Sequence, residues 1–225
     1  MPLRAVVFDF DGVIVDSEPL HFRSLQDALA LDGVAITERE YWSTYLAYDD
    51  REAIRLALET HGVRAAPERL DAVERRKVEA FARLIPEVAV FPGARELVRE
   101  LAARVPVAIA SGARRDEIEA ILAGIGLRDA FTTLVGFEDA ERAKPDPAPY
   151  LEAARRLAAH VPGLAPAECA AVEDSVPGIL SARGAGLRVV GVAHSYAPEK
   201  LGPAHRVVPS LVGLRPADFA ALFES

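Results

Sequence analysis

The sequence predicts an α/β fold in which a doubly wound parallel sheet carries an inserted helical domain. Short apolar runs recur along the chain, and each ends at polar residues. Such runs are typical of strands that are buried on both faces of a parallel sheet. Helix-periodic stretches separate the runs, whereas residues 16 to about 90 show only helical patterns. This alternation of strand and helix, interrupted once, predicts an α/β core with one insertion.

Five apolar runs have the length of a strand. They cover residues 5–8, 105–110, 132–135, 169–172 and 187–192. Helices are expected at residues 94–103, 117–127, 150–159 and 176–185, where apolar residues recur with helical spacing. In doubly wound sheets ligands bind beyond the carboxyl ends of the strands. The residues that follow each run are therefore the first candidates for a functional site.

The inserted segment is expected to form a helical domain of its own. Its helices are predicted at residues 21–31, 37–48, 51–61 and 67–84. The chain has 225 residues, half as many again as a typical domain of about 150. We therefore expect an α/β core of residues 1–15 and 91–225 and a helical cap domain of residues 16–90.

Composition argues against several classes of protein. Hydrophobic residues make up 51% of the chain and charged residues 27%, which suits a packed core. The net charge of −8 argues against nucleic acid or an anionic membrane as a partner. Cys169 is the only cysteine and has no disulfide partner within the chain. Because the chain shows neither a signal peptide nor a membrane span, we expect a cytoplasmic protein, either a monomer or a dimer.

Two acidic pairs follow predicted strands. Asp9 and Asp11 come after the first run, and Glu173 and Asp174 come after the run that begins at Cys169. Carboxylates beside an apolar strand end are costly unless a cation or hydrogen bonds hold them. The pairs therefore suggest a magnesium site in which one acid acts as nucleophile or proton donor. For a lone Asp-x-Asp the alternative is a pair of solvated turn residues; the second acidic pair favours the metal site.

Two further segments at strand ends or helix starts carry groups that bind phosphate. Ser111 and Gly112 follow the second run and open a helix, so a hydroxyl and free backbone N–H groups are available to an anion. Lys144 precedes Pro145 shortly before a predicted helix, and its point charge can neutralise a phosphate or the crowded acids. Each group alone is a weak signal, but four such segments on one sheet together indicate a phosphate-binding site.

The order and spacing of these motifs resemble the four-motif signature of the haloacid dehalogenase (HAD) superfamily. The helical insertion resembles the C1 cap of its subfamily I, which contains phosphoglycolate phosphatases and β-phosphoglucomutase. The residues that carry the resemblance are Asp9, Asp11, Gly12, Val13, Asp16, Ser17, Ser111, Lys144, Pro145, Glu173, Asp174 and Ser175. The resemblance extends from Ala5 to about Val192 and implies a HAD-like Rossmannoid core with an α-helical C1 cap.

The resemblance implies phosphoryl transfer through an aspartyl-phosphate. Asp9 would attack phosphorus in line, and Asp11 would protonate the leaving oxygen and later take a proton from water. Superfamily members that act as dehalogenases lack an aspartate at the position of Asp11, so its presence argues against dehalogenation.

The resemblance also implies a cofactor, Mg²⁺, and a phosphate site. The implied metal ligands are the Asp9 carboxylate, the Asp11 backbone carbonyl, Asp174 and, directly or through water, Glu173. The implied phosphate-binding residues are Ser111, Gly112 and Lys144. With this set the protein contributes mainly positioning and charge neutralisation.

Candidate substrate residues lie mostly in the insertion. His21, Arg51 and Lys77 lie near positions where β-phosphoglucomutase-like proteins have a histidine, a phosphate-binding arginine and a cap lysine, and Arg114 follows the phosphate-binding turn. The alternatives are a packed or solvated histidine and solvated helix faces. Ala113 stands where those mutases have a serine.

The remaining aromatic, histidine and cysteine residues suggest less. Tyr41, Tyr45 and Tyr48 would share one helical face, either as an aromatic wall over the site or, as we favour, as a core stripe. Trp42 lies in the same segment. The other histidines, at positions 61, 160, 194 and 205, have no partners at metal-ligand spacing and receive no role. Cys169 reads as a small buried hydrophobe.

The sequence thus predicts a magnesium-dependent phosphatase that acts on a small phosphorylated metabolite, with a sugar phosphate as the favoured substrate class. The alternative is a phosphosugar mutase of the β-phosphoglucomutase type. Both reactions begin with phosphoryl transfer to Asp9, so the core motifs do not separate them.

Overall fold

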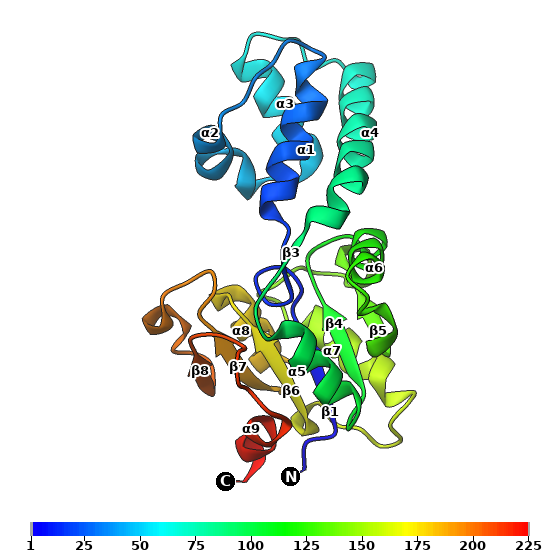
Figure 1. The fold of residues 1–225 in the computed structure, drawn as a ribbon, viewed down its shortest axis with the longest axis vertical. Helices are drawn as coiled ribbons and strands as arrows, with labels where there is room; N and C mark the ends of the chain where they lie inside the picture. The colour runs from blue at the N-terminus through cyan, green and yellow to red at the C-terminus, as the bar shows by residue number, and fades with distance from the viewer. Residues whose placement is uncertain (1, 225) are drawn as a thin grey trace. The chain divides into compact units, whose positions relative to one another are not determined.

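The computed structural model describes residues 2–224, which form two compact units. The first unit contains the N-terminal segment up to Asp16 and the chain from Ala89 onward, and the second is Ser17–Val88. The first is an α/β domain, and the second is built from helices (Figure 1).

The first unit contains a six-stranded sheet in the order β5-β4-β1-β6-β7-β8. Every neighbouring pair is parallel, so the predicted α/β class is confirmed. The strands are β1 (Ala5–Phe8), β4 (Val107–Ala110), β5 (Thr133–Val135), β6 (Cys169–Glu173), β7 (Arg188–Val192) and β8 (Arg206–Val208). The first five match the predicted runs closely. The sequence does not predict β8, because three residues leave too short a pattern to recognise.

Both faces of the sheet are buried, which explains why its strands are apolar without alternation. Val7 lies in a core shared with α7 (Ala148–Ala158) and α8 (Val176–Gly184). Phe8, the next residue of the same strand, is also buried and meets Phe131 edge to face. The other helices of this unit are α5 (Ala94–Ala102), α6 (Arg115–Gly124) and α9 (Pro216–Ala220).

Two short strands connect the units along the chain. β2 (Val15–Asp16) leads out of the α/β domain, and β3 (Ala89–Val90) returns to it. They pair antiparallel, and the N–H of Phe91 donates to the carbonyl of Ile14 at 3.0 Å. This pairing fixes the end of the turn that carries Asp9 and Asp11.

The second unit packs four helices around an apolar core. They are α1 (Glu18–Ala30), α2 (Glu38–Ser43), α3 (Asp50–Thr60) and α4 (Pro67–Leu84). A capping box between Thr37 and Glu40 explains the start of α2. The core includes Leu29, Ile54 and Val73. Within residues 2–224, no helix has the length and apolarity needed to cross a membrane.

One helix prediction in this unit is wrong. The segment 37–48 is not continuous, because α2 ends at Ser43 and a separate 3₁₀ turn follows at Tyr45–Ala47. Thr44, with φ −132°, has left the helical conformation. The three tyrosines therefore share no helical face: Tyr41 and Tyr45 are in the core, whereas Tyr48 is 49% exposed.

A cavity substitution tests the packing of the sheet. Ile109 is fully buried in β4, so Ile109→Ala is expected to lower the free energy of unfolding by about 2–5 kcal/mol. Leu151 on α7 is 43% exposed, and Leu151→Ala is expected to change the free energy of unfolding by only about 0.5 kcal/mol. Urea unfolding of the two variants measures the difference, and equal losses would contradict this packing.

Candidate active site

The register of the sheet brings the acidic motifs to one edge. Phe8 of β1 pairs with Ile109 of β4 and with Val172 of β6. The N–H of Asp9 then donates to the carbonyl of Val172 at 2.9 Å. Glu173 is the last residue of β6. The residues that follow β1, β4 and β6 therefore leave the sheet side by side at its carboxyl edge.

Three buried carboxylates and one lysine meet at this edge. Asp9, Glu173 and Asp174 each place one oxygen within 4.8 Å of the others. The Nζ of Lys144 donates to Asp9 Oδ1 at 2.7 Å and to Glu173 Oε1 at 2.6 Å. The loop that carries Lys144 thus joins the ends of β1 and β6 through a partly buried ion pair on each side.

Glu173 is held through both of its oxygens. Oε1 also accepts the hydroxyl of Tyr150 at 2.9 Å. Oε2 accepts from the N–H groups of Asp174 and Ser175 at 3.1 Å and from the Ser175 hydroxyl at 3.0 Å. A Cβ on Gly178 would overlap this carboxylate. The start of α8 is therefore shaped around the Glu173 carboxylate, which its N–H groups and the Ser175 hydroxyl hold in place.

Asp174 is positioned by two other loops. Its Oδ2 accepts a hydrogen bond from the hydroxyl of Ser195, which follows β7. A Cβ on Gly12 would overlap the same oxygen, and Gly12 has φ 79°, a left-handed conformation that favours glycine. His194 Nδ1 donates to the carbonyl of Gly12 at 2.9 Å, and its ring stacks on Phe91 at 4.1 Å. The loop after β7 therefore fixes both Asp174 and the turn after Asp9.

Asp11 lies in a tight turn that reverses the chain after β1. The carbonyl of Phe10 accepts the N–H of Ile14 at 2.8 Å, and the N–H of Gly12 donates to the carbonyl of Val15 at 2.9 Å. Asp11 itself is half-buried and forms a bridge with Val15. The two acids of the first motif thus have different environments, Asp9 buried and Asp11 partly open to solvent.

The predicted phosphate loop follows β4. Ser111 is buried, its N–H donates to the carbonyl of Val135 at 3.0 Å, and its hydroxyl accepts the N–H of Ala113 at 3.0 Å. Gly112 is exposed, and a Cβ there would meet no heavy atom within 4 Å. Packing within the chain therefore does not require glycine at position 112. The exposed turn leads directly into α6, as an anion site at a helix start requires.

Burial dominates the electrostatics of the cluster. Burial, followed by the neighbouring Glu173, raises the pKa of Asp9 well above its ordinary value. Burial raises the pKa of Asp174 to about 6, against the lowering effect of the Ser195 hydrogen bond. Burial alone would lower the pKa of Lys144, but Asp9 and Glu173 outweigh it and raise that pKa. Lys144 is therefore a permanent cation.

The donor set fits a hard divalent cation. One ammonium does not balance three buried carboxylates, and buried negative charge is costly without a counter-charge. Carboxylate oxygens are the ligands that Mg²⁺ prefers, and a cation here would favour the ionised acids. Of the three, Glu173 accepts the most hydrogen bonds from the protein. Asp9 and Asp174 are therefore the more available metal ligands.

The predicted cap residues are engaged within the second unit. Lys77 is only 3% exposed, so it does not lie on a solvated helix face; its Nζ lies 2.7 Å from Asp50 Oδ2 and 2.9 Å from His21 Nδ1. His21 stacks on Phe81 with ring centroids 4.4 Å apart. These contacts make a packed His21–Lys77–Asp50 group.

Both arginine candidates form ion pairs. Arg51 pairs with Asp71 at 2.9 Å and also with Glu74. Arg114 immediately precedes α6 and pairs with Asp116 at 2.9 Å on the surface. The contacts of the two side chains therefore give them structural partners, and their roles toward substrate stay predictions.

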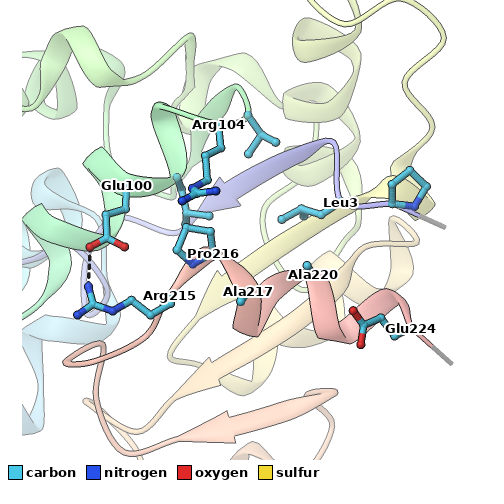
Figure 2. Close-up of a pocket in the computed structure, with 11 residues that line it drawn as sticks. Leu3, Glu100, Arg104, Arg215, Pro216, Ala217, Ala220 and Glu224 are labelled. Carbon is cyan, nitrogen blue, oxygen red and sulfur yellow. Dashed lines mark hydrogen bonds and ion pairs between the residues drawn. The ribbon is translucent and has the colours of Figure 1, made fainter.

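A pocket of about 550 Å³ lies elsewhere in the α/β domain (Figure 2). Leu3 and Val105, which line it, precede β1 and β4, so the pocket is at the edge where strands begin. Glu100 and Arg215 pair at 2.5 Å within it. None of the predicted site residues lines this pocket. The candidate active site is therefore defined by its side chains and not by the hollow in Figure 2.

Three residues of the site are missing from the sequence prediction. Ser195 and His194 follow a predicted strand, at the end where ligands bind in such sheets. The sequence pattern assigns His194 no role, whereas the structure shows it bonded to the turn after Asp9. Tyr150 carries no such signal, because it occupies an apolar position of a helix. Its contact with Glu173 depends on how α7 packs on the sheet.

A family model of haloacid dehalogenase-like hydrolases matches residues 3–186. The chain belongs to this family. The predicted resemblance is thus confirmed, and the matched range contains all four of the predicted motifs. As a member with these motifs, the chain is an enzyme, a HAD-family phosphohydrolase.

Named relatives of the HAD enzyme cover most of its length. Hexitol phosphatase B of Escherichia coli is 32% identical over 84% of this chain and 83% of its own. Fructose-1-phosphate phosphatase YqaB of E. coli is 30% identical over 83% of this chain and 95% of its own. The crystal structure of CbbY from Rhodobacter sphaeroides with phosphate has a TM-score of 0.80 and 28% identity, covering 97% of this chain and 99% of that one.

A substitution at Gly12 tests the contact between the two acidic motifs. Gly12→Ala adds a Cβ that overlaps Asp174 and strains a backbone with φ 79°. Gly163→Ala is the matched control, because Gly163 has φ 71° and open space around it. We expect about 1 kcal/mol of destabilisation for the control and about 2–4 kcal/mol for Gly12→Ala. Thermal unfolding measures both, and equal losses would contradict the close approach of Gly12 to Asp174.

Proposed function

We propose that this HAD enzyme is a Mg²⁺-dependent phosphatase of small phosphorylated metabolites, with sugar phosphates as the substrate class, and that it acts through a phosphoryl group carried on Asp9. The observation that carries the proposal is the pair of partly buried ion pairs that Lys144 forms with Asp9 and Glu173. It places a permanent cation against a carboxylate at the strand edge that also carries Ser111. A cation and a nucleophile in contact suit phosphoryl transfer, where positioning and charge neutralisation dominate.

In the first step a carboxylate oxygen of Asp9 forms a bond to phosphorus, and the bond from phosphorus to the ester oxygen breaks. The leaving oxygen takes the proton of the Asp11 carboxyl group, so the alcohol departs neutral. Lys144 and Ser111 hold the transferred phosphoryl oxygens while charge moves across them. The half-open environment of Asp11 suits a group that exchanges protons with substrate and water.

In the second step Asp11, now ionised, accepts a proton from a water molecule as the water oxygen bonds to phosphorus. The bond between phosphorus and Asp9 breaks, which releases inorganic phosphate and restores both carboxyl groups. Asp9, Asp174 and the Asp11 carbonyl would hold the Mg²⁺ ion, with Glu173 as a further ligand directly or through water. When bound, Mg²⁺ supplies positive charge to the phosphoryl oxygens.

Relatives and cap contacts support the choice of substrate and reaction. The two phosphatases described above are named for a hexitol and for fructose 1-phosphate, which supports a phosphorylated sugar or sugar alcohol here. A mutase needs cations for a second phosphate. The candidate cations Arg51 and Lys77 are already paired with carboxylates within the cap. Hydrolysis of a monophosphate therefore suits the chain better than mutase chemistry.

The nucleophile is tested by Asp9→Asn, which keeps the shape of the side chain and removes its charge. We expect phosphate release to fall roughly a thousandfold or more, with a thermal midpoint near that of the wild type. Asp129→Asn, at an exposed acid of the same unit, is the matched control and should keep full activity. Substantial turnover by folded Asp9→Asn would exclude Asp9 as the nucleophile.

The metal is tested by chelation. Treatment with EDTA should abolish phosphate release, and added Mg²⁺ should restore it. Calorimetric titration should show Mg²⁺ binding to the wild type and at least about tenfold weaker binding to Asp174→Asn. Full activity in excess EDTA would contradict the proposed metal dependence.

A substrate panel separates the phosphatase from the mutase. Hexose, hexitol and pentose monophosphates are incubated with enzyme and Mg²⁺, and both inorganic phosphate and isomeric sugar phosphates are measured. We expect inorganic phosphate to accumulate. Conversion of a hexose 1-phosphate to its 6-phosphate without phosphate release would overturn the proposal.

A further inference from the structure

The ammonium of Lys144 needs support that its own side chain does not provide. A lysine carries its charge on a flexible four-carbon stem. Here the Nζ contacts one oxygen of Asp9 and one of Glu173. During the proposed reaction Asp9 changes from a carboxylate to an acyl phosphate, so its contact with Lys144 changes. Glu173 is then the permanent anchor, and its Oε1 atom fixes where the ammonium lies.

Tyr150 contacts both members of this anchor. Its hydroxyl donates to Glu173 Oε1 at 2.9 Å, the same atom that accepts from Lys144. Lys144 Nζ lies over its ring, 5.1 Å from the ring centroid, within the range of a cation–π interaction. Tyr150 is completely buried. Water therefore has little access to either contact. Both kinds of contact are stronger in such a desolvated environment.

The surrounding backbone holds Tyr150 rigidly. It lies in the first turn of α7, six positions after Lys144 in the same segment. Between them Asp146 accepts the N–H of Ala148 at 2.9 Å through its side chain and the hydroxyl of Ser181 through its carbonyl. The other oxygen of Glu173 is taken by the start of α8. The Tyr150 hydroxyl and the Lys144 ammonium are thus the two donors that set the position of Oε1.

We propose that Tyr150 is a positioning residue that fixes the Lys144 ammonium for phosphoryl binding, through its hydrogen bond to Glu173 and through its ring. The proposal rests on the function proposed above. A purely structural role would need only the volume of the ring, since Tyr150 also belongs to the apolar core. Phenylalanine keeps that volume and loses the hydroxyl, so Tyr150→Phe separates the two roles.

The experiment compares Tyr150→Phe, Lys144→Arg and the double variant in steady-state kinetics and in binding of inorganic phosphate by calorimetry. For Tyr150→Phe we expect kcat/KM to fall about tenfold to a hundredfold and phosphate to bind at least about tenfold more weakly. Lys144→Arg replaces the ammonium, so adding Tyr150→Phe to it should cost much less than in the wild type. Tyr196→Phe, at a tyrosine that is 42% exposed, is the hydroxyl-deletion control and should match the wild type.

Each outcome decides the proposal. Wild-type kinetics and phosphate binding in Tyr150→Phe would overturn it, even if the thermal midpoint falls, because that is the result of a structural role alone. An undiminished loss in the Lys144→Arg background would also overturn it, since Tyr150 would then act independently of Lys144. If the wild type hydrolyses no phosphate ester, the proposed function fails, while the phosphate-binding measurements still test Tyr150. A crystal structure of Tyr150→Phe with a displaced Lys144 Nζ would support the proposal directly.

Discussion

The ion pairs of Lys144 with the buried acids Asp9 and Glu173 impose the strictest constraint on this protein. Charges removed from water are costly unless they are paired and hydrogen-bonded. Here an ammonium bridges carboxylates at the ends of two neighbouring strands, 2.7 and 2.6 Å away. The strand register, the loop before α7 and the start of α8 must all be in place at once. The fold of the core is thus inseparable from its chemistry.

Backbone groups and glycines complete what the charged side chains begin. The N–H groups at the start of α8 bind one oxygen of Glu173, and Gly178 leaves room for that carboxylate. Gly12 allows the turn after Asp9 to approach Asp174. The loop after β7 then holds this turn and Asp174 through His194 and Ser195. The site therefore draws on five segments of the chain, whereas the sequence motifs indicate four. The fifth is the loop after β7.

The helical unit has a different electrostatic character. Lys77 is buried against Asp50 and His21, and Arg51 is paired with two acids of α4. Lys77 and Arg51 are thus paired with carboxylates of their own unit. To bind a phosphate group of a substrate, they would have to break these ion pairs. In the core, by contrast, three buried carboxyl groups lie beside one lysine, and an added cation would favour their ionised forms. The contrast supports a monophosphate substrate bound with a metal.

The sequence by itself determined the α/β class, five of the six strands of the sheet, and the identity of Asp9, Ser111, Lys144, Glu173 and Asp174 as candidates. It did so because apolar runs and the polar residues that end them are local features. Only the tertiary structure decided the break in segment 37–48, the burial of Lys77 and the contacts of Tyr150, His194 and Ser195. Each depends on packing between segments far apart in the chain. The spacing of apolar residues along the chain does not predict the distances between side chains of separate segments, because strand register and helix packing set those distances.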